Sequence, residues 1–330
     1  MAIEYLGSDG FNNGTFRTDN IHMSGFSINA ATYNTGPYGI SAAYGGYIRY
    51  DIPDAANNAS VSLWMHPGSI LGGWAISQSL RVEFELSTGQ YVGVRWNETE
   101  KTLNAYVDGV SVATGSVAVG FCDWFQVQLY VIVDNAGYIG CKIGGQLALD
   151  YSGDTLPDGA AAEVDHLRVT AGNSAAQNVY FDDIVYGRGG FLGDCRSAWI
   201  KPSADTVVNE WTPSTAVDHY TTVDEVPSNI TDYLYTDTDG IEEELELENW
   251  DGAGKTPVAV TAWARAYEDV ATAESLQVGV DSDGVDDVTE YIMTDVYTYY
   301  SHFMDENPDG PAAWDNAAIN ALKLRLESVI

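Results

Sequence analysis

Apolar and polar positions alternate along much of the first 190 residues, and this alternation predicts short β-strands. Segment 82–86 reads Val-Glu-Phe-Glu-Leu, which is typical of a half-buried strand. Segment 127–133 repeats the pattern, with valine or leucine at every second position. The dipeptides Asp108-Gly109 and Gly144-Gly145 separate neighbouring runs and favour two-residue hairpin turns. We therefore expect an antiparallel β-sandwich.

A glycine-rich segment at 187–190 divides the chain, and we expect domains at 1–187 and 191–330. The second domain also has strand patterns, together with one short helix where apolar residues recur three or four apart at 312–322. We expect its strands at 195–201, 257–267, 276–280 and 289–299, with a last strand that ends at Ile330 and closes the sheet. The predicted class is mainly β, with a sandwich followed by a β-rich domain containing one short helix.

The charge is strongly acidic, with 48 acidic and 14 basic side chains and a net charge of −34. A polyanion would be repelled, so we expect no nucleic-acid partner and no docking to anionic membranes. Residues 1–190 carry −11 and residues 191–330 carry −23, and aspartate (30) far outnumbers lysine (5). This composition suits very high salt, where screening weakens self-repulsion. A halophilic source and a merely acidic protein both stay open.

The usual enzyme and membrane signals are absent from the sequence. The five histidines have no paired spacing, and no phosphate loop, nucleophile elbow or dinucleotide fingerprint occurs. The cysteines Cys122, Cys141 and Cys195 have no metal-ligand spacing, so buried free thiols are expected. We find no apolar leader and no run of about 20 apolar residues. We expect a protein made in the cytoplasm, without membrane insertion, catalytic residues or a bound cofactor.

One strand carries two glutamates that suggest a hydrolase. Glu83 and Glu85 lie two residues apart and therefore project from the same face. Jelly-roll glycoside hydrolases place their acid and nucleophile in an E-x-D-x-x-E pattern, but Thr88 stands at the third position here. A solvated outer face is the favoured interpretation.

Two acidic turns resemble calcium loops, at 237–240 and 281–284. Around the second turn, the candidate calcium ligands are Asp281, Asp283, Asp286 and Asp287. Asp-Gly turns between strands explain the same residues, so both interpretations stay open. The nearby run 242–248 is rich in glutamate and is expected to be a solvated edge strand.

Three segments of the first domain resemble a laminin-G-like or concanavalin-A-like jelly roll. They are Ser-Leu-Trp-Met at 62–65, the hairpin at 103–109 and the strand Phe-Asp-Asp-Ile-Val at 181–185. In that family the final strand pairs with a strand near the N-terminus. The resemblance covers about residues 1–187 and implies the fold without a function.

The second domain resembles a segment that recurs in tailed-phage virion proteins. The resemblance lies in Gly-Asp-Cys-Arg at 193–196, Glu-Trp-Thr-Pro-Ser at 210–214, Ala-Trp-Ala-Arg-Ala at 262–266 and the turn at 307–311. It implies a structural component of a tailed-virus particle, such as an outer head decoration, turret or fibre-like protein that contributes to host attachment. The implied partners are further copies of the chain, other virion proteins and a host-surface glycan or protein.

A second class of function stays open beside the virion role. The chain has 21 tyrosines and 9 tryptophans, and sandwich domains with surface aromatics bind sugars or pack against sister subunits. The alternative is therefore a carbohydrate-binding module or a jelly-roll glycoside hydrolase.

Overall fold

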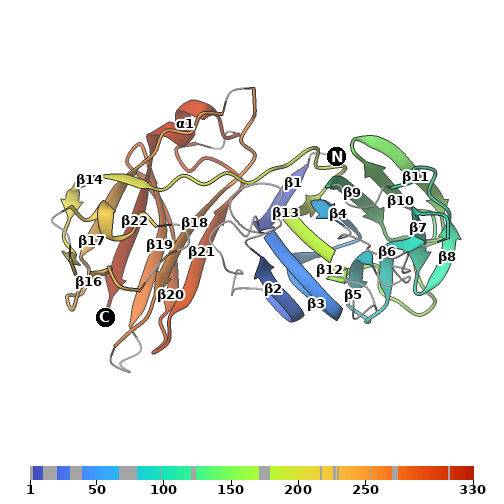
Figure 1. The fold of residues 1–330 in the computed structure, drawn as a ribbon, viewed down its shortest axis with the longest axis horizontal. Helices are drawn as coiled ribbons and strands as arrows, with labels where there is room; N and C mark the ends of the chain where they lie inside the picture. Colours follow the sequence, from blue (N-terminus) through green and yellow to red (C-terminus); the bar gives the residue numbers. More distant parts are fainter. Residues whose placement is uncertain are drawn as a thin grey trace. The chain divides into compact units, whose positions relative to one another are not determined.

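The computed structural model contains two compact units, of which unit 1 extends to Ala198 and unit 2 covers Trp199–Ile330 (Figure 1). The residues that it describes are 3–9, 21–29, 39–66, 80–97, 99–119, 124–170, 179–215, 218–225, 228, 230–252, 254–269, 274–310 and 313–330.

Unit 1 is an antiparallel jelly-roll sandwich. Its strands are β1 (Glu4–Asp9), β2 (Ile21–Asn29), β3 (Gly39–Ala56), β4 (Asn58–His66), β5 (Arg81–Leu86), β6 (Tyr91–Asn97), β7 (Thr102–Val107), β8 (Val110–Ala113), β9 (Phe125–Ile132), β10 (Gly137–Ile143), β11 (Gln146–Gly153), β12 (Val164–Thr170) and β13 (Val179–Arg188). They are hydrogen-bonded in the order β11-β10-β9-β4-β13-β3-β12-β5-β6-β7-β8, with β1 beside β13 and β2 beside β3. Both halves of this path contribute to one apolar core.

The alternating pattern of the sequence is confirmed in this unit. In β5, Val82 and Phe84 are fully buried in the core, as are Leu129 and Val131 in β9. The two expected hairpins join β7 to β8 and β10 to β11. Their turn residues at 108–109 and 144–145 all have positive φ, which is why glycine and aspartate occupy them. The final strand β13 pairs with the N-terminal strand β1, as the jelly-roll resemblance implied.

The segment 189–197, beyond β13, packs against the outer face of β4 and β9. The Ser60 Oγ donates to the Gly190 carbonyl at 2.5 Å, and the Gln126 Nε2 donates to the Gly193 carbonyl at 2.8 Å. The Arg196 guanidinium stacks on the Trp64 ring at 3.6 Å. Polar side chains on this outer face are therefore buried under the chain itself. The structure places the division between units after Ala198, whereas the sequence suggested a boundary between 187 and 191.

Unit 2 is built from a five-stranded sheet, two two-stranded sheets and one short helix. Its elements are β14 (Pro202–Asn209), β15 (Thr212–Pro213), the 3-10 helix η1 (Tyr220–Thr222), β16 (Leu234–Tyr235), β17 (Glu242–Leu247), β18 (Val260–Ala266), β19 (Ser275–Ser282), β20 (Val285–Ile292), β21 (Thr298–Met304), α1 (Asn316–Ala321) and β22 (Leu322–Val329). The large sheet has the order β14-β17-β22-β19-β20, and β18 pairs with β21. Its core contains Val278, Tyr300, Trp314 and Leu326.

Several expectations for this unit are wrong in detail. The expected strand at 195–201 has no strand geometry, and β14 begins at Pro202 instead. The expected strand at 289–299 is two strands, β20 and β21, separated by a turn. The glutamate-rich run is not a solvated edge, because β17 lies between β14 and β22 in the interior of the sheet. The final strand β22 is confirmed, and it also occupies an interior position.

Two described cysteines are buried free thiols, as expected. Burial raises the pKa of Cys141 to about 12 and that of Cys195 to about 11, so both stay protonated at neutral pH. Cys122 lies outside the described residues. Within the described part of the chain, no helix combines the length and apolarity needed to cross a bilayer.

Candidate functional site

Charged and aromatic side chains gather on the outer face of the sheet β3-β12-β5-β6-β7 in unit 1. Along each of these strands they alternate with residues that point into the core. We call this surface the arginine face, and it consists of Tyr47, Arg49 and Asp51 on β3, His166 and Arg168 on β12, Arg81, Glu83 and Glu85 on β5, Tyr91 and Arg95 on β6, and Tyr106 on β7. Four of the nine arginines of the chain therefore lie on one face of one sheet.

Cross-strand register brings these residues into rows. Arg49 lies opposite Arg168, which lies opposite Glu83. Glu83 in turn lies opposite Gly93 on β6. A Cβ atom at Gly93 would lie 2.6 Å from the Glu83 Cα, so the glycine leaves the space above it free for the neighbouring side chains. Sequence-distant residues therefore meet because the four strands pair in this order.

Glu83 is buried among arginines. Its side chain is 2% exposed, and its carboxylate accepts from the Arg95 Nε at 2.5 Å, with the Arg81 guanidinium 4.0 Å away. The Arg95 guanidinium also lies over the Tyr106 ring, 4.8 Å from its centre. The expectation of a solvated outer face at Glu83 is therefore wrong: the strand alternation was right, but the ion pairs cover the carboxylate.

Glu85 and Thr88 do not complete a hydrolase pattern. Glu85 shares the face with Glu83 and lies 3.8 Å from the Arg49 guanidinium. The strand ends at Leu86, so Thr88 is in the exposed turn that follows and does not project from the strand. The third position of the E-x-D-x-x-E pattern is thus absent from β5 both in sequence and in space.

Two tyrosines hold Arg168. Its guanidinium donates to the Tyr91 hydroxyl at 2.6 Å and lies 4.5 Å from the centre of the Tyr47 ring and 5.3 Å from that of Tyr91. Burial raises the pKa of Tyr91 above its usual value despite the nearby Arg168, so the phenol stays protonated. The tyrosines therefore fix the orientation of the guanidinium.

The arginine face keeps access to solvent at its margin. The side chains of Asp51 and Arg81 are 36% and 35% exposed, and His166, 3.1 Å from Asp51, is 23% exposed. Among the described residues, the ion pairs of the face join its own members to one another. This differs from the outer face of β4 and β9, which the segment 189–197 covers.

The four candidate calcium ligands do not come together. Asp281 and Asp286 face each other across the β19–β20 hairpin, and Asp283 lies in its turn with φ of 52°. Asp287 instead accepts a hydrogen bond from the His302 Nε2 at 2.8 Å. The hairpin interpretation therefore accounts for the Asp-Gly turn, and the four carboxylates form no single calcium site.

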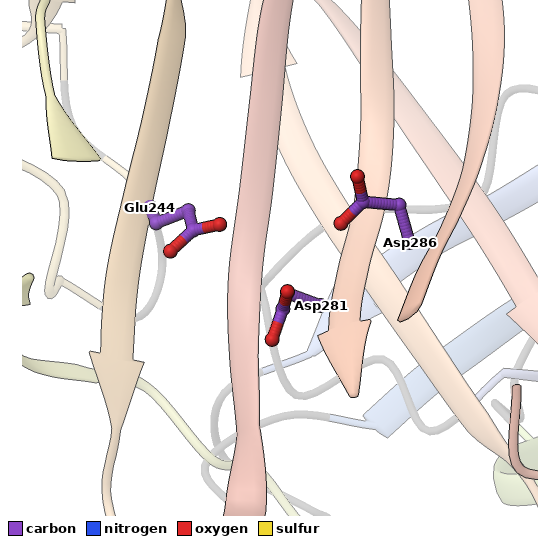
Figure 2. A group of neighbouring side chains, drawn as sticks. All are labelled: Glu244, Asp281 and Asp286. Atoms are coloured by element: carbon purple, nitrogen blue, oxygen red, sulfur yellow. The ribbon is translucent and has the colours of Figure 1, made fainter. Parts of the chain in front are cut away.

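Asp281 and Asp286 join Glu244 of β17 in a different cluster, in which the three carboxylates approach within 4.8 Å of one another (Figure 2). β22 runs between them and supplies cations. The Lys323 Nζ lies 3.3 Å from Glu244 and 3.5 Å from Asp281. The Arg325 guanidinium lies 3.3 Å from Asp286. These carboxylates are thus matched by side chains of the chain itself.

Arg325 is the centre of this network. Its side chain is 9% exposed, and besides Asp286 it pairs with Glu242 at 2.7 Å, Glu327 at 3.4 Å and Glu244 at 3.5 Å. The hydrogen bond to Glu242 is the main reason why the pKa of Arg325 is raised and that of Glu242 lowered. Gly279 lies beside Arg325 in register, so no side chain competes for this space.

The outer face of the large sheet in unit 2 is strongly acidic, and we expect its stability to depend on salt. Two cations lie among seven carboxylates on this face, which are Glu242, Glu244, Glu246, Asp281, Asp286, Glu290 and Glu327. At about 1 M salt the screening length falls to about 3 Å, which weakens the repulsion between unpaired carboxylates. Unit 2 should therefore melt at a higher temperature in molar NaCl than in low salt by differential scanning calorimetry. Equal melting temperatures would contradict this prediction and the interpretation of the acidic composition as adaptation to salt.

A hydrogen-bonded pair of Glu243 and His219 lies on the core side of the same sheet. Glu243 is 0% exposed and its carboxylate lies 2.8 Å from the His219 Nδ1. The Trp211 backbone N–H donates to the other carboxylate oxygen at 3.1 Å. Burial raises the pKa of Glu243, although both of these contacts act in the opposite direction. This pair connects the residue before η1 to β17, on the side of the sheet opposite the acidic outer face.

The sequence contains a pattern for the arginine face, but it does not show which strands pair with one another. Arginine recurs at alternate positions with aromatic or acidic residues in the strand segments 47–51, 81–85, 91–95 and 166–168. Each segment alone is an ordinary half-buried strand, and only pairing order makes them neighbours. Among the tryptophans, Trp96 is buried, Trp124, Trp211 and Trp250 are partly exposed, and Trp74 lies outside the described residues.

Comparisons with known proteins add the following. No family model and no curated protein matches the chain. Among solved structures, the cellulose induced protein Cip1 is 12% identical over 54% of this chain and 95% of its own, with a TM-score of 0.42. Domain 4 of AbnA, an extracellular arabinanase from Geobacillus stearothermophilus in complex with arabinotriose, is 14% identical over 58% of this chain and 96% of its own, with a TM-score of 0.43. A carbohydrate esterase from the Shiga toxin-encoding bacteriophage phi24B is 15% identical over 57% of this chain and 100% of its own, with a TM-score of 0.42. At such identities the likeness shows the fold alone.

Proposed function

We propose that unit 1 is a carbohydrate-binding domain and that it holds a glycan on the arginine face. The observation that supports this most is the combination on one face of two partly exposed tyrosine rings, Tyr47 and Tyr91, with guanidinium, carboxylate and imidazole groups. Sugar rings have apolar C–H faces, which pack on aromatic rings, and hydroxyls, which exchange hydrogen bonds with planar charged groups. Tyrosine and arginine together meet both needs.

The side chains of the arginine face are preorganised for binding. Arg95 and Arg168 are each held by a ring and by a second polar partner, so little side-chain freedom is lost when a ligand arrives. The face also lies on paired strands and not on loops, which limits its movement. A rigid face of this type suits recognition of a repeating polymer.

We propose binding without hydrolysis. The Glu83 side chain is 2% exposed and its carboxylate is engaged by Arg95 at 2.5 Å, with Arg81 4.0 Å away, so a bound glycan would have little access to it. Hydrolysis in jelly-roll enzymes of the two-carboxylate type needs a second carboxylate, and Thr88 occupies that sequence position in a turn. The expectation of a non-enzyme is kept as part of this proposal.

Titration of the full chain with oligosaccharides checks the proposal. We expect saturable binding of at least one glycan class by isothermal titration calorimetry, and a loss of about threefold to tenfold in affinity in Tyr47→Ala, because a stacking ring is removed. Tyr235→Ala is the matched control, since this tyrosine is exposed in unit 2 and should leave binding unchanged. Release of reducing ends should stay at background. Absence of binding to every glycan class would refute the proposal.

The role in a tailed-virus particle stays a prediction. It rests on the resemblance of residues 193–328 to virion proteins, and it includes an outer head, turret or fibre-like position, assembly with further copies and residence in the virion. A carbohydrate-binding unit 1 is compatible with host-surface attachment, which would join the two expectations in one protein.

A further inference from the structure

We propose that the glycan held by the arginine face is anionic and that Arg168 is the anchor for its carboxylate or sulfate group. This inference rests on the proposed function and specifies the chemical class of the ligand. It starts from the observation that, among the described residues, Arg168 has no carboxylate partner although the chain has 48 acidic side chains.

The partner that register offers to Arg168 is engaged elsewhere. Glu83 lies directly opposite Arg168 on the neighbouring strand. Its carboxylate instead binds Arg95 at 2.5 Å and lies near Arg81 at 4.0 Å. Arg168 is left with a neutral phenol as its acceptor, since Tyr91 stays protonated. A guanidinium that is held but not neutralised is suited to an incoming anion.

Several hydrogen-bond donors on the arginine face have no partner in the described part of the chain, which also favours an oxygen-rich ligand. The Nε atoms of Arg49, Arg81 and Arg168 are all buried and have no hydrogen-bond partner among the described residues. A buried donor without a partner is costly, and an oxygen-rich ligand would satisfy such donors. The Nε atoms of Arg188, Arg265 and Arg325 elsewhere in the chain share this feature, so it accompanies the missing ion pair at Arg168 and does not replace it.

The local charge also favours an anion, in contrast to the chain as a whole. The described side chains of the face carry four guanidinium groups and three carboxylates, so the face is net positive while the chain carries −34. Long-range repulsion would oppose an acidic glycan at low salt, and screening would remove this repulsion more than it weakens the contacts on the partly buried face. Binding should therefore persist at moderate salt.

The test measures the affinity of the full chain for three probes by isothermal titration calorimetry. They are a polyuronate, a sulfated dextran and unmodified dextran, and the first two distinguish carboxylate from sulfate as the anion. We expect the chain to bind one or both acidic probes and to bind neutral dextran at least tenfold more weakly. In Arg168→Gln the affinity for the acidic probe should fall about tenfold to a hundredfold, because a charge-assisted contact is lost. The affinity of Arg168→Lys for the acidic probe should lie between those of the unmodified chain and Arg168→Gln, because lysine keeps the positive charge but lacks the planar guanidinium.

Arg196→Gln is the matched control, because Arg196 also stacks on an aromatic ring in unit 1 but belongs to the segment over β4 and β9. It should bind as the unmodified chain does. A second measurement avoids any effect of substitution on folding: the acidic probe should protect Arg168 of the unmodified chain from phenylglyoxal, read by mass spectrometry, and should leave Arg196 unprotected.

The outcomes separate this inference from the proposed function. Equal affinity for neutral and acidic probes overturns the inference and leaves carbohydrate binding intact. The same holds if the acidic probe binds Arg168→Gln as tightly as the unmodified chain and does not protect Arg168 from phenylglyoxal. Absence of binding to these probes together with tight binding of another neutral glycan overturns the inference alone. Failure to bind any glycan overturns both.

Discussion

Arg325→Ala should destabilise unit 2 by about 3–5 kcal/mol, the range seen when one partner of a buried ion pair is removed. Arg325 is 9% exposed and lies within 3.5 Å of carboxylate oxygens of Glu242, Glu244, Asp286 and Glu327. Its removal leaves four carboxylates around one space with Lys323 as the remaining cation. The free energy of unfolding, measured with urea on the full chain, should show the loss. Hydrogen exchange of β17 and β22 should assign the loss to unit 2.

Lys201→Ala provides the control for this substitution, because it removes one positive charge from the same unit at a solvent-exposed pair. Lys201 lies 3.6 Å from Asp224, and both side chains are about one-third exposed. Exposed pairs contribute about 0–1 kcal/mol, so this variant should be close to the unmodified chain. Molar NaCl should recover part of the loss in Arg325→Ala through screening. A loss below about 1 kcal/mol in Arg325→Ala would show that the network does not stabilise the sheet.

His219→Ala should also cost about 3–5 kcal/mol at neutral pH, because Glu243 then keeps a buried charge without its imidazole partner. The remaining donor to this carboxylate would be the Trp211 backbone N–H. An acid whose pKa is higher in the folded chain favours folding most when it is protonated. Its contribution is therefore greatest at low pH and declines as pH rises from the usual glutamate range to the raised pKa. Loss of His219 raises this pKa further, so the difference from the unmodified chain should shrink as the pH falls.

Urea unfolding at several pH values checks this prediction. The double variant with leucine at both 219 and 243 removes both polar partners and should be about as stable as the unmodified chain, since apolar replacement of a buried pair is often neutral or stabilising. If the single variant lost the same amount of stability at every pH, the buried charge would not be the cause. Lost packing around the imidazole would then explain the effect.

The two units differ in how much of their structure followed from sequence. In unit 1 the strict alternation at 82–86 and 127–133, together with two hairpin dipeptides, was enough to predict strands, turns and a sandwich. In unit 2 the pattern is weaker, and the turn between β20 and β21 contains no glycine that would have marked it. The glutamate run at 242–248 predicts a solvated edge strand because charges usually stay in water. Lys323 and Arg325 of β22 lie beside it and make an interior position possible.

The candidate sites depended on information that no single segment contains. Asp281 and Asp286 were singled out by spacing and do lie together, because a two-residue turn imposes that pairing locally. Glu244 joins them from a strand far away in the sequence. On the arginine face, Arg168 and Glu83 become neighbours only because β12 pairs with β5.

The sequence by itself determined the β class, the hairpins, the burial of the alternating residues and the concentration of acidic charge in the second half of the chain. Each of these follows from a local period, a local turn preference or a count. Only the tertiary structure decided which strands pair, and with that which charges neutralise one another. Ion pairing acts over a few ångströms, so it depends on cross-strand neighbours that the linear pattern does not contain. For this reason Glu83 pairs with Arg95, while Arg168 on the neighbouring strand donates to the Tyr91 hydroxyl.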